Sequence, residues 1–249
     1  MFRFSNFCAV CLVTAICASA VLMLGGCAGA PGGGLAGGPG HFSKMVIDPG
    51  HGGKDSGGVS GRGVPVYLRE KDLTLDTAKR VRNDLRNAGL RTVMTREDDH
   101  FVELDDRVRF ADAQGPGAIL VSIHYDAVSN REMNGAKTFY WRADSHGLAT
   151  RIQRHLVAAT GEANIGVLRR RLRLTRNPDI PCVLCECAYI TNPVEARKAS
   201  MDSYRQKVAN GIAQGILEQY RLGDAGIPPV PEIYAPPSRA SDKYTPRNH

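Results

Sequence analysis

Apolar and polar positions follow one another along this chain in a pattern that predicts strands and helices in turn. Short apolar runs predict strands at 44–48, 91–95, 118–124, 136–142 and 183–190. Apolar positions at helical spacing predict helices at 70–88, 104–113, 145–160 and 204–220, with a short helix after Pro193. This alternation predicts one α/β domain with a twisted, mostly parallel sheet and helices on both of its faces.

The segments between these elements differ in character. Residues 49–68 are rich in glycine and polar side chains and form a loop long enough to be functional. Residues 166–175 are basic and predict a strand or a hairpin. Beyond Gly223 the chain is rich in proline and polar residues, which is typical of disorder. We therefore place the folded domain at 44–222 and a disordered tail at 223–249.

The first residues, 1–26, predict a secretory signal and not a part of the fold. Arg3 precedes a charge-free apolar run, 7–24, and small residues follow the run. Because the run is near the lower limit for a membrane span, an uncleaved membrane anchor is the alternative interpretation.

The motif at 24–27, Leu-Gly-Gly-Cys, resembles the lipobox of bacterial lipoproteins. This resemblance implies cleavage before Cys27 and a lipid on its sulfur, with a flexible linker over the rest of 27–43. Ala28 stands where an Asp would favour retention at the inner membrane. We therefore expect a periplasm-facing lipoprotein of the cell envelope, held at the outer membrane.

Charge and cysteine content narrow the picture further. The formal net charge of +7 indicates an acidic partner, such as an anionic polymer, a membrane or nucleic acid, without choosing among them. Outside the predicted signal and Cys27, only Cys182, Cys185 and Cys187 remain, too few for a disulfide framework. In a strand, Cys185 and Cys187 face away from Glu186, and we expect buried thiols there. A second metal site that uses these cysteines is the alternative.

Three candidate metal ligands stand at the ends of predicted elements. His51 follows the first strand on a glycine-rich turn, Glu70 opens the helix after the long loop, and His124 ends the third strand. Ligand sites of α/β sheets collect at the carboxyl ends of strands. Two His and one carboxylate form a ligand set that catalytic zinc uses. Each residue also has a simpler interpretation, as a loop His, a helix-dipole carboxylate and a core His respectively.

A fourth chemical group, Glu186, lies within an apolar strand. An unpaired carboxylate is costly to bury in such a place. Glu186 therefore either pairs with a buried Arg such as Arg176, or it faces a site and has a raised pKa that suits a general base.

Several stretches of the chain agree in order and spacing with one known family. They lie at 47–55, 70–73, 95–96, 101–104, 107, 122–124, 172–176, 181–186 and 191–193. With these stretches, residues 44–222 resemble the catalytic domain of zinc-dependent N-acetylmuramoyl-L-alanine amidases, the type 3 amidases. The resemblance implies a zinc-hydrolase-like fold, one zinc ion held by His51, Glu70 and His124, and Glu186 as the catalytic glutamate.

The resemblance also implies a substrate. It implies hydrolysis of the amide bond between the lactyl group of N-acetylmuramic acid and L-alanine of the stem peptide, in cell-wall turnover or daughter-cell separation. The partners would be peptidoglycan and, through Cys27, a membrane, and not nucleic acid. The candidate substrate-binding residues are Arg171, Arg173, Arg176 and Asp126, although the arginines also suit a solvated hairpin face.

Two other functions stay open at this point. The chain could be a non-catalytic, lipid-anchored peptidoglycan-binding protein, or a metallopeptidase that cuts within the stem peptide. Some relatives carry an inhibitory helix between the second His and the catalytic Glu, and the interval 125–185 has no room for one. We therefore expect a site that is open without an activator, and any protein activator is unknown.

Overall fold

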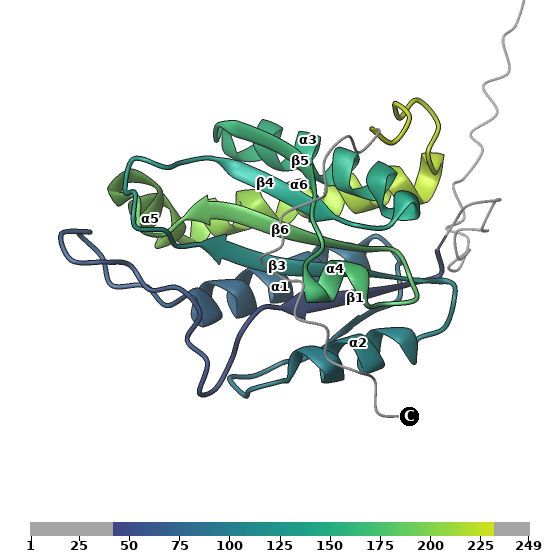
Figure 1. The fold of residues 1–249 in the computed structure, drawn as a ribbon, viewed down its shortest axis with the longest axis horizontal. Coiled ribbons are helices and arrows are strands. Elements are labelled where there is room, and N and C mark those ends of the chain that lie inside the picture. Colours follow the sequence, from purple (N-terminus) through teal and green to yellow (C-terminus); the bar gives the residue numbers. More distant parts are fainter. Residues whose placement is uncertain (1–41, 232–249) are drawn as a thin grey trace, which may run out of the picture. The chain divides into compact units, whose positions relative to one another are not determined.

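A six-stranded sheet is the framework of the computed structural model, which describes residues 42–231 (Figure 1). Its strands are β1 (Lys44–Pro49), β2 (Thr92–Met94), β3 (Ala118–Asp126), β4 (Ala136–Tyr140), β5 (Asn164–Arg169) and β6 (Cys182–Tyr189). Their order in the sheet is β2-β1-β3-β6-β4-β5, and every neighbouring pair is parallel except β4 with β6. The predicted fold class is therefore confirmed.

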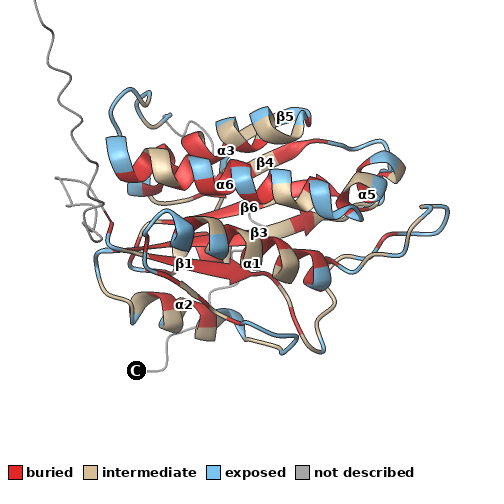
Figure 2. Ribbon diagram, turned by 180° about the vertical axis from the view of Figure 1, so that it is seen from behind, coloured by how far each residue is buried: buried red, intermediate tan, exposed pale blue. Residues whose placement is uncertain are grey.

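Helices cover both faces of this sheet (Figure 1, Figure 2). They are α1 (Glu70–Asn87), α2 (Leu104–Asp112), α3 (His146–Thr160), α4 (Arg173–Arg176), α5 (Pro193–Ala199) and α6 (Asp202–Leu222), with a 3₁₀ turn, η1 (Ala143–Ser145), before α3. Helix α6 packs against α1 and α3 on one face, and α2 and α4 lie on the other. The helices cover the faces of the sheet, and the candidate site lies at the ends of its strands.

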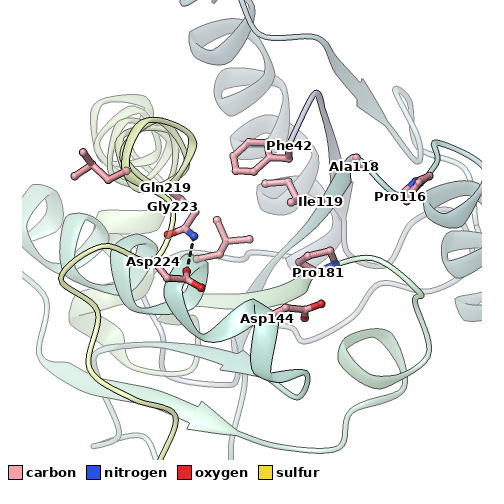
Figure 3. Close-up of a pocket in the computed structure, with 12 residues that line it drawn as sticks. Phe42, Pro116, Ala118, Ile119, Asp144, Pro181, Gln219, Gly223 and Asp224 are labelled. Atoms are coloured by element: carbon pink, nitrogen blue, oxygen red, sulfur yellow. Dashed lines mark hydrogen bonds between the residues drawn. The ribbon is translucent and has the colours of Figure 1, made fainter. Parts of the chain in front are cut away.

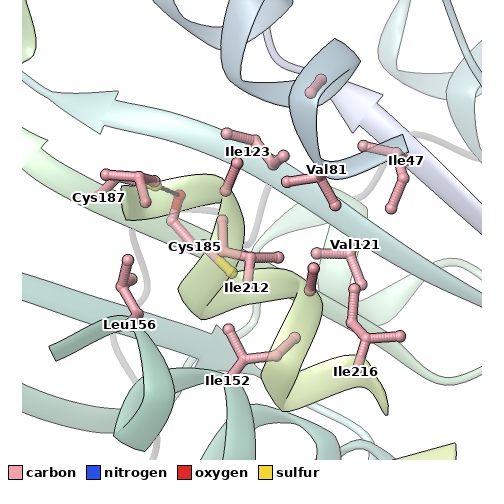
Figure 4. Close-up of a cluster of buried hydrophobic side chains, with 14 of the residues drawn as sticks. Ile47, Val81, Val121, Ile123, Ile152, Leu156, Cys185, Cys187, Ile212 and Ile216 are labelled. Carbon is pink, nitrogen blue, oxygen red and sulfur yellow. Dashed lines mark hydrogen bonds between the residues drawn. The ribbon is translucent and has the colours of Figure 1, made fainter. Parts of the chain in front are cut away.

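The larger core lies between the sheet and helices α1, α3 and α6 (Figure 4). The predicted apolar stripe of α1 is buried there, at Leu73, Thr77, Val81 and Leu85. Cys185 and Cys187 are buried free thiols in this same core, as their alternation with Glu186 along β6 predicts. Burial of such apolar side chains supplies the main favourable contribution to folding.

Two glycines of α6 allow close contact between helices α3 and α6. A Cβ atom at Gly211 would lie 2.7 Å from the Cα of Leu156, and one at Gly215 would lie 2.5 Å from the Cα of Ile152. Because these neighbours are backbone atoms, a larger residue would force the two helices apart.

The segment at 166–175 differs from its prediction. Strand β5 ends at Arg169, and the residues predicted to form the second half of a hairpin instead form the one-turn helix α4. The backbone N–H groups of Thr175 and Arg176 both donate to the carbonyl oxygen of Leu172, which closes that turn. Of the two predicted forms, the strand is therefore observed over β5, which pairs with β4, and the hairpin is not observed.

The amino-terminal edge of the sheet holds a cavity of about 430 Å³ (Figure 3). Its lining comes from the starts of strands and from the end of α6, and includes Phe42, Ala118, Ile119, Pro181, Gly223 and Asp224. Phe42 also packs edge-on against Tyr220, with ring centroids 5.5 Å apart. Phe42, at the start of the described residues, and Gly223, just after α6, therefore both lie at this edge.

Parts of the predicted domain organisation lie outside the described residues. These are the signal at 1–26, almost all of the linker at 27–43, and the tail after residue 231. At the start of the tail, the carbonyl oxygens of Gly223 and Ala225 accept hydrogen bonds from Arg151. Among helices of the described residues, none has the length and apolar character needed to cross a membrane.

Candidate metal centre and active site

Parallel pairing brings the candidate residues to one edge of the sheet. Strand β1 pairs with β3 as far as Pro49 opposite Ile123, so that His51 lies just beyond the end of β1, next to His124. Strand β3 pairs with β6 so that His124 lies directly opposite Glu186. The carboxyl ends of three neighbouring strands therefore place residues from distant parts of the chain together.

His51, Glu70 and His124 form a compact group. The Nε2 atom of His51 lies 3.0 Å from Oε2 of Glu70, and Nδ1 of His124 lies 2.8 Å from its Oε1. One donor atom from each residue lies within 4.8 Å of the others. The Glu70 side chain is only 7% exposed, against 23% for His51, so the group opens to solvent on the imidazole side. The three residues that the sequence nominated are thus brought together.

Hydrogen bonds fix the orientation of these three side chains. The backbone N–H groups of Gly58 and Tyr125 donate to the two carboxylate oxygens of Glu70. The Nδ1 atom of His51 donates to Asp55 at 2.8 Å, so its Nε2 atom is the one presented to the group. A carboxylate behind a ligating imidazole fixes its tautomer and orientation.

The charges within this group depend on one another. Burial alone would raise the pKa of Glu70, but hydrogen bonds from His124 and His51 hold that pKa far below its usual value. Burial alone would lower the pKa of His51, but its contacts with Glu70 and Asp55 raise the pKa instead. The Glu70 carboxylate therefore stays ionised between the two imidazole rings.

Two buried arginines hold the turn that carries His51. His51 has a positive φ of 60°, which is uncommon for a residue other than glycine. Nη2 of Arg107 donates to the carbonyl oxygen of His51 at 2.7 Å, and Nη2 of Arg96 donates to that of Gly50 at 2.9 Å. Arg107 also forms a buried ion pair with Asp48, 2.6 Å long. We infer that these contacts offset the cost of the His51 backbone conformation.

Gly50 leaves room for His124, and this gives a test of the site. A Cβ atom at Gly50 would lie 2.2 Å from Cε1 of the His124 ring. Because the group could hold a metal ion, we expect Gly50→Ala to displace the imidazole and to weaken metal binding by about 10- to 100-fold, measured by competition with a chromophoric chelator. Gly61→Ala is the matched control, because a Cβ atom there meets no atom within 4 Å. Equal metal affinity in both variants would contradict the prediction.

Glu186 lies between residues of the two strands that flank β6. It faces His124 on one side and Lys137 of β4 on the other. Its Oε2 atom is buried and has no hydrogen-bond partner among residues 42–231. Burial raises the pKa of Glu186 well above its usual value, and the negative charge of Glu70 adds to this effect. A carboxyl group with a raised pKa beside a ligand cluster suits proton transfer.

Lys137 and Asp126 form an ion pair next to Glu186. The Nζ atom of Lys137 also donates to the hydroxyl of Tyr189 at 2.7 Å. Asp126, which the sequence analysis nominates for substrate binding, is therefore already engaged with Lys137. The position of Lys137 beside Glu186 could not be predicted from the sequence, because it depends on the antiparallel pairing of β4 with β6.

The three arginines nominated for substrate binding make contacts of their own. Arg173 pairs with Asp105 of α2, Nε of Arg176 donates to the Asn177 side chain, and Arg171 lies over the Trp141 ring. The positive charges that act on Glu186 are those of Lys137 and a different arginine, Arg170. Pairing of Glu186 with Arg176 is not observed.

The donor set fits a divalent metal ion. Two imidazole nitrogens and one carboxylate oxygen face a common point, with Asp55 behind one imidazole. Catalytic zinc sites use three such protein ligands and leave one position open. His51, Glu70 and His124 could therefore hold a metal ion. They form the one group of three or more potential ligands found within the described residues.

Comparison with known proteins agrees with this geometry. The family model described as N-acetylmuramoyl-L-alanine amidase matches residues 45–218. The chain is 37% identical over 181 residues to N-acetylmuramoyl-L-alanine amidase LytC of Bacillus subtilis, an alignment that covers 71% of this chain and 35% of that protein. It is 34% identical over 186 residues to "Probable cell wall amidase LytH" of Staphylococcus epidermidis, covering 75% of this chain and 61% of that protein. It thus spans less than two thirds of these relatives.

Solved structures show the same domain. The catalytic domain of CwlV, an N-acetylmuramoyl-L-alanine amidase from Bacillus (Paenibacillus) polymyxa var. colistinus, superposes with a TM-score of 0.67 at 33% identity, covering 72% of this chain and 99% of that one. An N-acetylmuramoyl-L-alanine amidase from Clostridium difficile superposes with a TM-score of 0.68 at 31% identity, covering 74% and 99%.

Proposed function

We propose, from the premise that this chain belongs to the N-acetylmuramoyl-L-alanine amidase family, that it is a zinc-dependent peptidoglycan hydrolase. It would cleave the amide bond between the lactyl group of N-acetylmuramic acid and L-alanine of the stem peptide. The observation that carries this proposal is the convergence of His51, Glu70 and His124, with Glu186 in register beside them. Relatives named as amidases support the substrate class.

Each residue of the site would have a distinct task. His51, Glu70 and His124 would hold one zinc ion, and Asp55 would keep the His51 ring oriented. Bound zinc would supply a more acidic water molecule and polarise the scissile carbonyl group. Glu186 would accept a proton from the attacking water at its carboxylate and pass it to the nitrogen of the leaving amine. Its raised pKa lets the carboxyl group retain that proton until the amine departs.

The direct test is digestion of purified sacculi with the purified protein and zinc. We expect free stem peptides that begin with L-alanine, together with glycan strands that keep intact lactyl groups. Treatment with a chelator should abolish this release, and added zinc should restore it. No activator protein is added. An inhibitory helix, where relatives have one, lies between the second His and the catalytic Glu, and here α3 is the one helix longer than four residues between β3 and β6.

The products separate the proposal from its alternatives. Mass spectrometry that finds cuts between amino acids of the stem peptide would identify a metallopeptidase. Binding to sacculi without any product would identify a peptidoglycan-binding protein. Either result would overturn the proposed amidase activity.

We also propose that the protein is a lipoprotein of the cell envelope, anchored through Cys27 at the periplasmic face of the outer membrane. The support is the lipobox-like motif at 24–27 and the linker that follows it. Incorporation of a labelled fatty acid, tested against Cys27→Ser, measures the anchor directly. Equal label in both proteins would contradict it.

A further inference from the structure

Arg170 projects from the end of strand β5 across the sheet. Its backbone N–H donates to the carbonyl oxygen of Tyr140 at 2.8 Å, which fixes the residue next to the end of β4. Its guanidinium carbon lies 5.6 Å from the ring centroid of Phe139. Contact with an aromatic face holds the planar guanidinium group in one orientation.

The pairing of β4 with β6 places this guanidinium group on the same face of the sheet as Glu186. Lys137 lies opposite Glu186, and Phe139 lies opposite Leu184. Residues that face one another across paired strands, and alternate residues along each strand, share one face of the sheet. Phe139 and Glu186 therefore point the same way, and Arg170 lies over the surface that leads to Glu186.

One hydrogen-bonding group of Arg170 has no partner. Its Nε atom is buried and makes no hydrogen bond to any residue between 42 and 231. Neighbouring Arg169 and Arg173 differ, because Nε of Arg169 donates to the Trp141 carbonyl and Arg173 pairs with Asp105. Buried polar groups of folded proteins are nearly always paired, so an oriented, unpaired guanidinium group indicates a missing partner.

That partner does not come from the described part of the chain. Arg170 and Glu186 attract one another, but no ion pair joins them, and Oε2 of Glu186 is also buried without a partner. Lys137 pairs with Asp126 and donates to the Tyr189 hydroxyl, so it is not the missing partner of Glu186. A ligand that satisfies both groups must offer acceptor oxygens to Arg170 and an N–H or O–H donor to Glu186.

We propose that Arg170, stacked on Phe139, forms a subsite for a carboxylate group of the stem peptide. This inference rests on the proposed function, because the scissile amide and its water supply the donors for Glu186. The guanidinium group offers two parallel N–H donors that match a carboxylate, whereas a neutral carboxamide offers one acceptor oxygen and no charge. The subsite would thus recognise peptides with a free carboxylate at the matching position.

The test measures binding and not turnover. A series of stem peptides, each with one carboxylate replaced by a carboxamide, is titrated calorimetrically into the zinc-loaded full chain. In the wild-type protein we expect one of these replacements to weaken binding by about 10- to 100-fold. In Arg170→Gln the unmodified peptide should bind correspondingly more weakly, and the same replacement should have no further effect. Arg170→Lys should recover part of the affinity, since it keeps the charge without the planar fork.

Arg109→Gln is the control for loss of one positive charge. Arg109 lies on α2, and its side chain is 71% exposed. The Arg109→Gln variant should bind the whole peptide series as the wild-type protein does. The inference fails if Arg170→Gln retains the full carboxylate preference, or if the wild-type protein binds no stem peptide. If sacculi remain uncut while Arg170 still discriminates among the peptides, the subsite stands and the proposed hydrolysis falls.

Discussion

Glu186→Ala is expected to lower the rate of amide hydrolysis by about 10²- to 10⁴-fold while one zinc ion stays bound. The position of Glu186 is the reason why activity should fall while the metal stays bound. Glu186 lies on β6, opposite His124, but it is not among the three residues whose donor atoms converge. Removing it should take away proton transfer and leave the ligands in place. Rates on soluble muropeptides and metal analysis of the same preparations measure both quantities.

Glu186→Gln sharpens this experiment. The amide keeps the shape of the side chain and cannot accept the proton, so its rate should fall nearly as far as that of the Ala variant. Loss of zinc from either variant would move Glu186 into the ligand set and leave the base unassigned. A rate that falls less than tenfold would show that another group transfers the proton.

Arg107→Met is expected to lower the free energy of unfolding by about 3–5 kcal/mol. Asp48 is fully buried, and Arg107 is its charged partner at 2.6 Å. Without Arg107, the Asp48 carboxylate would be left buried and uncompensated. The carbonyl oxygens of Pro49 and His51 would also lose the hydrogen bonds that Arg107 donates. Urea unfolding at neutral pH, with a chelator present throughout, measures the change without a contribution from bound metal.

The matched control is Arg109→Met. Arg109 pairs with Asp106 on the surface, where their side chains are 71% and 48% exposed, and such pairs contribute at most about 1 kcal/mol. Equal destabilisation by the two substitutions would show that the buried pair has no special role.

Acidification should reduce the difference between wild type and Arg107→Met. Burial alone would raise the pKa of Asp48, but Arg107, Thr95 and Ser122 together lower it in the folded protein. A carboxyl group with a lowered folded-state pKa stabilises the fold above its unfolded pKa of about 3.9, and this stability is lost as the pH falls through the folded value. Without Arg107, the strongest cause of the lowering is gone, so the variant should lose less stability on acidification to pH 3.5.

The sequence predicts the elements and the metal ligands for identifiable reasons. The stripe from Leu73 to Leu85 has helical period, and it is buried as one face of α1. His51 and His124 follow apolar runs, so their positions at the carboxyl ends of strands could be inferred before the pairing was known.

Other parts of the site depend on pairing that no local pattern contains. Arg107 lies in a helix whose period does not distinguish a buried arginine from a solvated one, and its partner Asp48 is 59 residues away. Lys137 and Arg170 act on Glu186 because β4 runs antiparallel to β6, and a sheet expected to be mostly parallel does not reveal which pair is antiparallel. For this reason the candidates from the basic segment were Arg171, Arg173 and Arg176, whereas the arginine whose charge acts on Glu186 is Arg170.

The position of the domain's two ends has a consequence for its reach. Phe42 and Gly223 both line the cavity at the starts of the strands, whereas His51 lies beyond the opposite end of β1. A protein fastened through Cys27 would be tethered at the end of the described domain that lies away from His51. The chain between Cys27 and Phe42 can extend at most roughly 50 Å. Its length would set the depth of cell wall that a membrane-bound molecule can cut.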